Sequence, residues 1–241
     1  MFTWTSKTAV LCATFFLVSC AGVFDGLNLG ARSGRTNDAS QIAVTADQII
    51  IKGPQGFCVD PSSVRDTDDT GFVILGNCAA ITQSRLAAQP DAPAILTAAI
   101  SGPGTPGQVA ANMDGMDAFF RSVEGRGVLS RDRSFESVTI FETLAENGVF
   151  YLRARDTSAA PVDGVQAEYW RAYMDMGQRI VTLSVLGLEG RELATPQGLN
   201  TLRGFVQAIR TANVGILSVE PAILDRDAGV ASIRPSSGEI N

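Results

Sequence analysis

The chain contains no histidine, and this absence removes several kinds of chemistry at once. Without an imidazole there is no Ser-His or Cys-His nucleophile pair, no histidine general base and no histidine metal ligand. Lysine is scarce as well, because only Lys7 and Lys52 occur among the 19 basic residues. The formal net charge of −6 argues against nucleic acid as a partner, since such proteins need a basic face to neutralise phosphates.

The length and composition of the chain predict one folded domain with long tails. The 241 residues are 45% hydrophobic and 18% charged, which is enough apolar surface for a core. Small and polar residues dominate 20–46, which we expect to be a flexible tether. We expect a single domain at 47–215 and a loosely ordered tail at 216–241.

The N-terminus has the features of a secretory signal. Lys7 precedes an apolar run, 8–18, that is too short to cross the roughly 30 Å hydrocarbon core of a membrane as a helix. The run leads into 17–20 (LVSC), which resembles the lipobox of bacterial lipoproteins. The resemblance implies a signal peptide at 1–19, a lipid on Cys20 and a domain held in the periplasm by that membrane anchor. Ala21 implies, by the same resemblance, the outer membrane. The alternatives are an ordinary cleaved signal peptide and an uncleaved anchor.

The cysteine count agrees with an oxidising compartment. Cys12 lies in the signal and Cys20 in the lipobox, which leaves Cys58 and Cys78 as an even pair. In a periplasmic protein such a pair predicts a disulfide. A metal site would need further cysteine or histidine ligands, and a redox site would favour C-x-x-C spacing.

The pattern of apolar residues predicts an α+β fold, an antiparallel sheet built largely from hairpins with two main helices packed on it. A stripe of apolar residues predicts one continuous helix at 108–124, and a second helix is expected at 195–211. Hairpins are expected at 137–156 and 165–186.

The first hairpin is specified in detail by its turn. Asn147-Gly148 between two β-rich runs is the signal of a two-residue type I′ turn. Counting outward from this turn pairs Glu142 with Arg153, which carry opposite charges. The same count predicts one buried face with four members, namely Phe141, Ala145, Phe150 and Leu152.

Two segments carry resemblances to known groups. The element order around Tyr169–Leu188 and the closing helix Leu199–Ile209 resembles the PsbP/Mog1/DcrB-like fold. That resemblance implies an antiparallel sheet with helices on its faces, and a binding or accessory role in membrane-linked assemblies. The segment 56–61 (GFCVDP) is similar to an uncharacterised lipoprotein group of marine alphaproteobacteria.

The acidic segment 66–71 (DTDDTG) has the first ligand positions and the glycine of an EF-hand calcium loop. The twelfth position is Asn77, where a bidentate glutamate is needed, and the segment continues into an apolar strand. It is therefore not an EF-hand. A weaker calcium site and a solvated turn stay open as alternatives.

Paired carboxylates could serve a hydrolase that acts on glycosidic bonds in the envelope. The candidate pairs are Asp114 with Asp117 and Glu142 with Glu168. The sequence places neither pair in a cleft, so we assign no catalytic residue, metal ligand or cofactor.

The aromatic residues gather in the hairpin region. Tyr169 and Tyr173 lie on one face of a predicted strand with Arg171 between them. Tyrosines of this kind favour binding surfaces, although half-buried sheet packing is the commoner explanation of such a pattern. We therefore predict a non-enzymatic binding or accessory module with an envelope protein partner. The alternatives are an envelope hydrolase and a small-molecule or calcium-binding protein.

Overall fold

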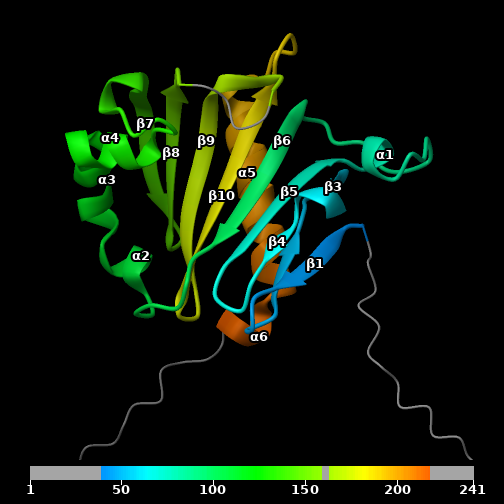
Figure 1. The fold of residues 1–241 in the computed structure, drawn as a ribbon, viewed down its shortest axis with the longest axis horizontal. Helices are drawn as coiled ribbons and strands as arrows, with labels where there is room; N and C mark the ends of the chain where they lie inside the picture. The colour runs from blue at the N-terminus through cyan, green and yellow to red at the C-terminus, as the bar shows by residue number, and fades with distance from the viewer. Residues whose placement is uncertain (1–38, 159–162, 218–241) are drawn as a thin grey trace, which may run out of the picture. The chain divides into compact units, whose positions relative to one another are not determined.

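The computed structural model describes residues 39–158 and 163–217, and it confirms the expected α+β class (Figure 1). The large sheet has eight strands: β3 (Phe57–Val59), β4 (Arg65–Asp66), β5 (Gly71–Asn77), β6 (Ala94–Ile100), β7 (Val138–Glu146), β8 (Val149–Asp156), β9 (Val165–Met176) and β10 (Arg179–Leu188). Their order is β3-β5-β6-β10-β9-β8-β7, with β4 paired to β5, and every pair is antiparallel. A separate hairpin is formed by β1 (Gln41–Val44) and β2 (Ile49–Lys52).

Helices cover the sheet on both sides. The long helix α5 (Thr195–Ala212) packs behind the sheet in Figure 1, and we call this side the back face. On the opposite side, the front face, lie α2 (Gln108–Ala111), α3 (Met113–Arg121) and α4 (Val123–Leu129). The remaining helical turns are short, and they are α1 (Cys78–Ile81), α6 (Val214–Leu217), η1 (Pro61–Ser63) and η2 (Phe135–Ser137).

Each face of the sheet has its own apolar core. On the back face, Leu202, Phe205 and Ile209 of α5 are buried against β6, β9 and β10, together with apolar residues of the β1–β2 hairpin. On the front face, Phe120 of α3 packs among buried side chains such as Phe150 and others from β8 and β9. Burial of each large apolar side chain contributes on the order of 1.5–3 kcal/mol, so both faces of the central strands stabilise the fold.

The first hairpin has the predicted turn and register. Asn147 and Gly148 both have positive φ, at 51° and 71°, as a type I′ turn requires. Glu142 pairs with Arg153 as expected, with Nε and Oε2 3.5 Å apart. The predicted buried face is only half correct, since Phe141 is 39% exposed and Ala145 is also exposed. A bulge between Ile140 and Glu142 displaces Phe141 on this edge strand.

The single helix expected at 108–124 is wrong, because the segment forms three helices. Ser122 adopts an extended backbone and starts α4 by accepting a hydrogen bond from the Gly125 amide, 3.1 Å away. A Cβ at position 125 would lie 1.9 Å from the Phe119 carbonyl oxygen, so the tight corner requires glycine. Most of the apolar stripe still faces the sheet, since Val109 and Met116 both join the front core, but Val123 at its end is 49% exposed.

The expected tether at 20–46 also needs correction, because its last residues belong to the folded unit. Residues 41–44 form β1, which pairs with β2, and Val44 is fully buried. Asn213, which ends α5, reinforces this hairpin, since its side-chain amide donates to the Ile50 carbonyl and accepts from the Ile50 amide, both at 2.8 Å. The expected signal peptide, Cys20 and the tail beyond Leu217 lie outside the described residues.

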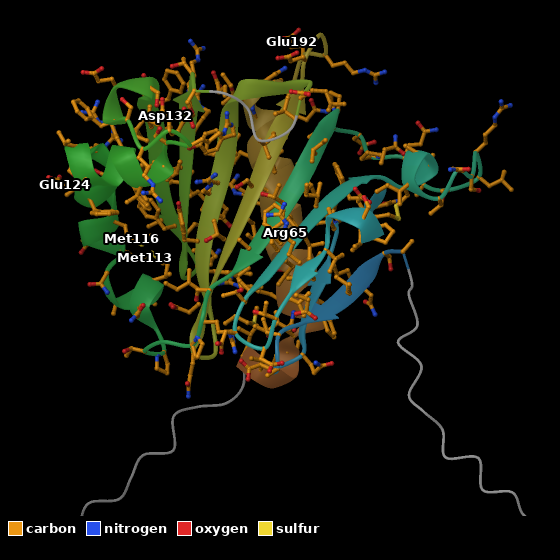
Figure 2. All side chains as sticks on the ribbon, in the orientation of Figure 1. Arg65, Met113, Met116, Glu124, Asp132 and Glu192 are labelled. Carbon is orange, nitrogen blue, oxygen red and sulfur yellow. A yellow bond between two sulfur atoms is a disulfide. The ribbon has the colours of Figure 1, made fainter. Side chains whose placement is uncertain are left out.

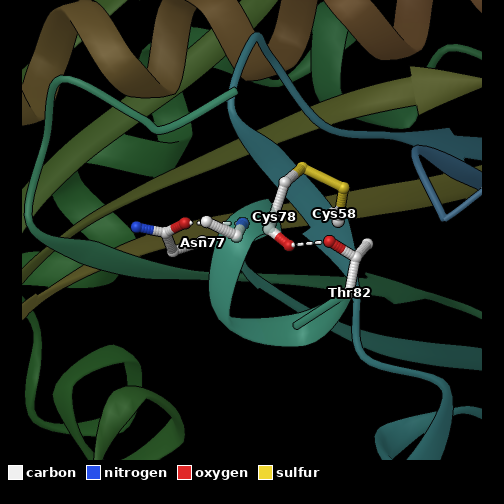
Figure 3. Close-up of a disulfide and its surroundings, with 5 residues drawn as sticks. Cys58, Asn77, Cys78 and Thr82 are labelled. Carbon is white, nitrogen blue, oxygen red and sulfur yellow. Dashed lines mark hydrogen bonds between the residues drawn. A yellow bond between two sulfur atoms is a disulfide. The ribbon is translucent and has the colours of Figure 1, made fainter. Parts of the chain in front are cut away.

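A disulfide joins Cys58 and Cys78, as the sequence predicts (Figure 3). Their Cα atoms are 4.8 Å apart, and the bond ties β3 to the start of α1. Two hydrogen bonds hold this turn: the Asn77 side chain accepts from the Ala79 amide at 2.8 Å, and the Thr82 hydroxyl donates to the Cys78 carbonyl at 2.7 Å.

We expect the double variant Cys58→Ala/Cys78→Ala to lose about 3 kcal/mol of its free energy of unfolding, because the closed loop spans 20 residues. Urea denaturation of the variant and the unreduced protein measures this difference. Labelling of Cys58 or Cys78 by a thiol reagent in the unreduced, folded protein would contradict the expectation.

Candidate functional site

Part of the front face carries no described helix. The helices α2, α3 and α4 lie over β7, β8 and β9, whereas β10, β6 and β5 face the viewer without a covering helix (Figure 1). The alternation of side chains along these strands identifies the uncovered residues. We call them the open floor; Phe72, Ile74, Thr97, Ala99 and Thr182 are partly exposed, and Ser184 at its edge is buried.

Arg171 on β9 lies at one border of the open floor. Its Nε donates to the Ser184 hydroxyl at 3.0 Å, and its guanidinium carbon lies 4.7 Å from the centre of the Tyr169 ring. Among the described residues no carboxylate forms an ion pair with it. Burial by itself lowers the pKa of Arg171, but its contacts with Tyr173 and Tyr169 outweigh this and raise the pKa. The side chain is therefore a fixed positive charge.

Arg65 on β4 lies at the opposite border. Its strand register aligns it with Phe72, and its guanidinium carbon is 5.9 Å from the centre of that ring. Figure 2 shows Arg65 in front of the sheet. The side chain is exposed and, in the part of the chain that the structure describes, it has no ion-pair partner. Sequence reasoning missed this residue, because a two-residue strand gives no periodic signal.

Among the described residues, the floor between the two arginines has no carboxylate. Asp175 lies on the same face of β9 as Arg171, and its two oxygens accept the Val109 and Ala110 amides at 3.0 and 2.9 Å, where α2 begins. Asp156 on β8 is buried, and burial raises its pKa. Hydrogen bonds from Ser158 and the Arg131 amide nevertheless lower the pKa overall. The floor is therefore positive in a protein whose net charge is −6.

The predicted tyrosine surface is only partly exposed. Register places Tyr169, Arg171 and Tyr173 on one face, as expected. Tyr169 is only 3% exposed and belongs to the front core, so it is not a binding residue of the surface. Tyr173 is partly buried and stacks on Phe120 with ring centres 5.1 Å apart. The two tyrosines are wholly or partly buried because α3 packs over this part of the sheet, and the sequence alone does not show which strands a helix covers.

An apolar groove adjoins Arg171 on the side of α2 and α3. It has a volume of about 370 Å³ and is lined on the sheet side by Tyr173 and Ile180. The helices contribute Val109, Met116, Phe119 and Phe120, with Gln108 and Asn112 at its rim. Phe119 is 44% exposed, so this wall presents an aromatic ring to solvent.

Backbone carbonyls of the acidic segment 66–71 accept hydrogen bonds from an arginine of the same chain. Arg179 is 5% exposed and pairs with the Asp47 carboxylate. It also donates to the carbonyls of Asp68 and Asp69, and to that of Ser101 at 3.0 Å. Within residues 39–158 and 163–217, no group of three or more side chains suited to a metal occurs.

Three of the four candidate carboxylates pair with arginines. Arg153 contacts Glu142 at 3.5 Å and Glu168 at 2.8 Å, so these acids share one positive partner.

Asp117 accepts from the Thr143 hydroxyl at 2.6 Å and from Arg121 at 2.8 Å, and these contacts, Thr143 first, lower its pKa. Its candidate partner Asp114 lies in the first turn of α3. Each described contact therefore gives these acids a structural role.

Comparison with known proteins finds no relative. No family model matches the chain, and neither a curated protein nor a solved structure is similar to it. Among the helices that the structure describes, none combines the length and apolar character needed to cross a membrane.

Proposed function

We propose that this chain is a lipid-anchored protein of the bacterial envelope whose α+β domain is a non-enzymatic binding or accessory module facing the periplasm. In this proposal Cys20 carries the lipid, and Ala21, the residue that follows it, favours attachment to the outer membrane. The partner is another envelope protein, and it docks on the open floor and its borders.

The observation that carries the proposal is the uncovered, positively charged part of the front face. A sheet face without a covering layer usually marks a contact surface, and here Arg171 and Arg65 border it. Arginine is enriched at protein interfaces because its planar group makes several directed hydrogen bonds.

The remaining observations favour binding over the two alternatives. Three of the four carboxylates considered for hydrolysis pair with Arg153 or Arg121, and carbonyls of the acidic loop considered for calcium accept hydrogen bonds from Arg179. The Cys58–Cys78 disulfide suits an oxidising compartment such as the periplasm.

Thr97 offers a direct test, because it lies in the middle of the open floor and is partly exposed. We expect Thr97→Tyr to abolish capture of the partner when the lipidated protein is purified in mild detergent from its own membranes. A tyrosine suits a strand, so the fold is retained while its ring blocks the surface.

The matched control is Thr139→Tyr, since Thr139 is exposed on β7 away from the floor. It should retain the partner at wild-type stoichiometry, as quantified by mass spectrometry. If no partner co-purifies with the wild type, or if both variants retain it equally, the open floor is not the docking surface.

A further inference from the structure

We propose that the open floor accepts an extended acidic segment of a protein partner, with an apolar side chain of that segment seated in the neighbouring groove. This inference rests on the proposed function and adds the chemistry of the partner. Its observations are two guanidinium groups that form no ion pair with a described carboxylate, a floor that has no carboxylate among the described residues, and an apolar groove that begins at Tyr173.

The first step is the unused hydrogen-bonding capacity of Arg171. A guanidinium has five N–H donors, and hydrogen bonds to Ser184 and Tyr173 use two of them. Stacking on Tyr169 fixes the plane of the group, so little side-chain entropy is lost when it binds. A carboxylate is the natural acceptor, because it can take two parallel hydrogen bonds from this fork.

The second step is the spacing of the two arginines. The guanidinium of Arg65 lies over Phe72 of β5, which is three strands away from Arg171 on β9. Neighbouring strands are about 4.8 Å apart, and the register places Phe72 opposite Tyr173, two residues along β9 from Arg171, so the separation is roughly 16 Å. Two side chains that are four residues apart on an extended chain lie about 13 Å apart on the same side. The long side chains of glutamate and arginine can span the remaining difference, so glutamates with this spacing can meet both arginines.

The third step is the position of the groove. Tyr173 follows Arg171 two residues later on the same face of β9 and forms a wall of the groove. The other walls are Met116, Phe119, Phe120 and Ile180. An apolar side chain next to a glutamate would bury surface there, which adds affinity that charge alone does not supply.

A segment of protein fits this surface better than a charged membrane does. Arg171 is partly buried and donates to Ser184, which is 3% exposed, and the neighbouring Tyr173 stacks on Phe120 of α3. A single side chain of a peptide can reach Arg171 at this position. The helices α2, α3 and α4 lie on the same face of the sheet, and they would hold a flat layer of lipid headgroups away from Arg171.

The experiment uses the full-length lipidated chain in neutral detergent and a fluorescein-labelled peptide, Glu-Ser-Thr-Ser-Glu-Ser-Phe. We expect saturable binding by fluorescence anisotropy that weakens as salt is raised. Arg171→Gln should weaken binding about tenfold or more, as expected for the loss of a charged hydrogen-bond partner. Arg65→Gln tests the other border and, being an exposed position, should not disturb the fold.

Matched controls separate charge on the floor from charge elsewhere. Arg85→Gln removes the same charge from an exposed position in the loop after α1 and should leave affinity unchanged. A peptide with glutamine for both glutamates should not bind, and one with alanine for phenylalanine should bind more weakly. Arg171→Lys keeps the charge but loses the fork, so its affinity should fall between those of the wild type and Arg171→Gln.

Several outcomes would overturn the inference. They are no binding of the acidic peptide, equal binding of the glutamine peptide, and equal loss in Arg85→Gln. Arg171-dependent binding to phosphatidylglycerol vesicles without peptide binding would instead assign the floor to a membrane surface. If the peptide fails but a partner is still captured and lost in Thr97→Tyr, the proposed function stands and only the acidic character of the partner is wrong.

Discussion

Replacement of Arg179 by methionine is expected to lower the free energy of unfolding by about 3 kcal/mol or more, because several buried carbonyl groups lose their hydrogen-bond donor. Arg179 begins β10, and its guanidinium is surrounded by oxygens from three other parts of the chain. These are the loop between β1 and β2, the acidic segment 66–71 and the end of β6.

The expected loss is large because methionine fills the space but donates no hydrogen bond. The carbonyls of Asp68, Asp69 and Ser101 would lose a donor, and Asp47 would lose its positive partner. An unsatisfied buried polar group costs roughly 1–3 kcal/mol, so a few such groups account for the total. Arg179→Lys should lose less, since lysine keeps the charge with fewer donors.

Urea denaturation followed by circular dichroism measures the effect. The matched control is Arg203→Met, whose guanidinium pairs with Glu146 at 2.8 Å on the surface, with both side chains about 40% exposed. That pair should contribute at most about 1 kcal/mol. Equal denaturation midpoints for the Arg179 and Arg203 variants would show that the oxygens around Arg179 find other partners, and the expectation would be wrong.

The acidic segment 66–71 shows which of its features could be predicted from the sequence and which could not. A run with acids at alternate positions and a glycine predicted either a weak cation site or a solvated turn. Its carbonyl oxygens do converge on a positive group, but that group is Arg179, which lies more than a hundred positions later in the chain. Local spacing can show that oxygens converge, whereas the identity of the cation depends on a distant strand.

The first hairpin and the broken helix show the same limit of sequence reasoning: a local turn can be predicted, whereas a contact formed in the folded chain cannot. Asn147-Gly148 specifies its own turn, and the pairing of neighbouring strands follows by counting. The break at Ser122 depends on a close approach between Gly125 and Phe119 that hydrophobic periodicity does not record. Periodicity identifies which side of a segment is buried, and it does not establish that the helix axis is continuous.

The candidate site was the least accessible to sequence reasoning. Arg171 and its strand were identified, because the alternation along one strand fixes which side chains share a face. Arg65 belongs to the same surface only because β5, β6 and β10 lie between β4 and β9 in the sheet. That order pairs strands far apart in sequence, and no local pattern encodes it.

The substitution Cys20→Ala is expected to give the largest change in localisation, from a membrane-bound protein to an unprocessed or released one. In the proposed mature protein the thiol of Cys20 holds the lipid. Each buried CH₂ group contributes about 0.8 kcal/mol, and a stable anchor needs two or more chains. Removing the attachment atom removes this entire contribution rather than a part of it.

Incorporation of radiolabelled palmitate, together with membrane fractionation, measures the change. Cys12→Ala is the matched control, because it removes a thiol from the same apolar segment without touching the proposed acceptor. The control should remain labelled and membrane-bound. Persistent labelling of Cys20→Ala would show that the lipid is elsewhere, and an unlabelled protein that stays in the membrane would support an uncleaved anchor.

The same variant separates the two parts of the proposed function. Anchoring confines the domain to a membrane surface and raises its effective concentration near membrane-bound partners, whereas recognition depends on the open floor. Released Cys20→Ala protein should therefore bind the acidic peptide as well as the lipidated protein does. If release also abolished peptide binding, the lipid or the membrane would be part of the recognition surface, and Arg171 and Arg65 alone would not account for it.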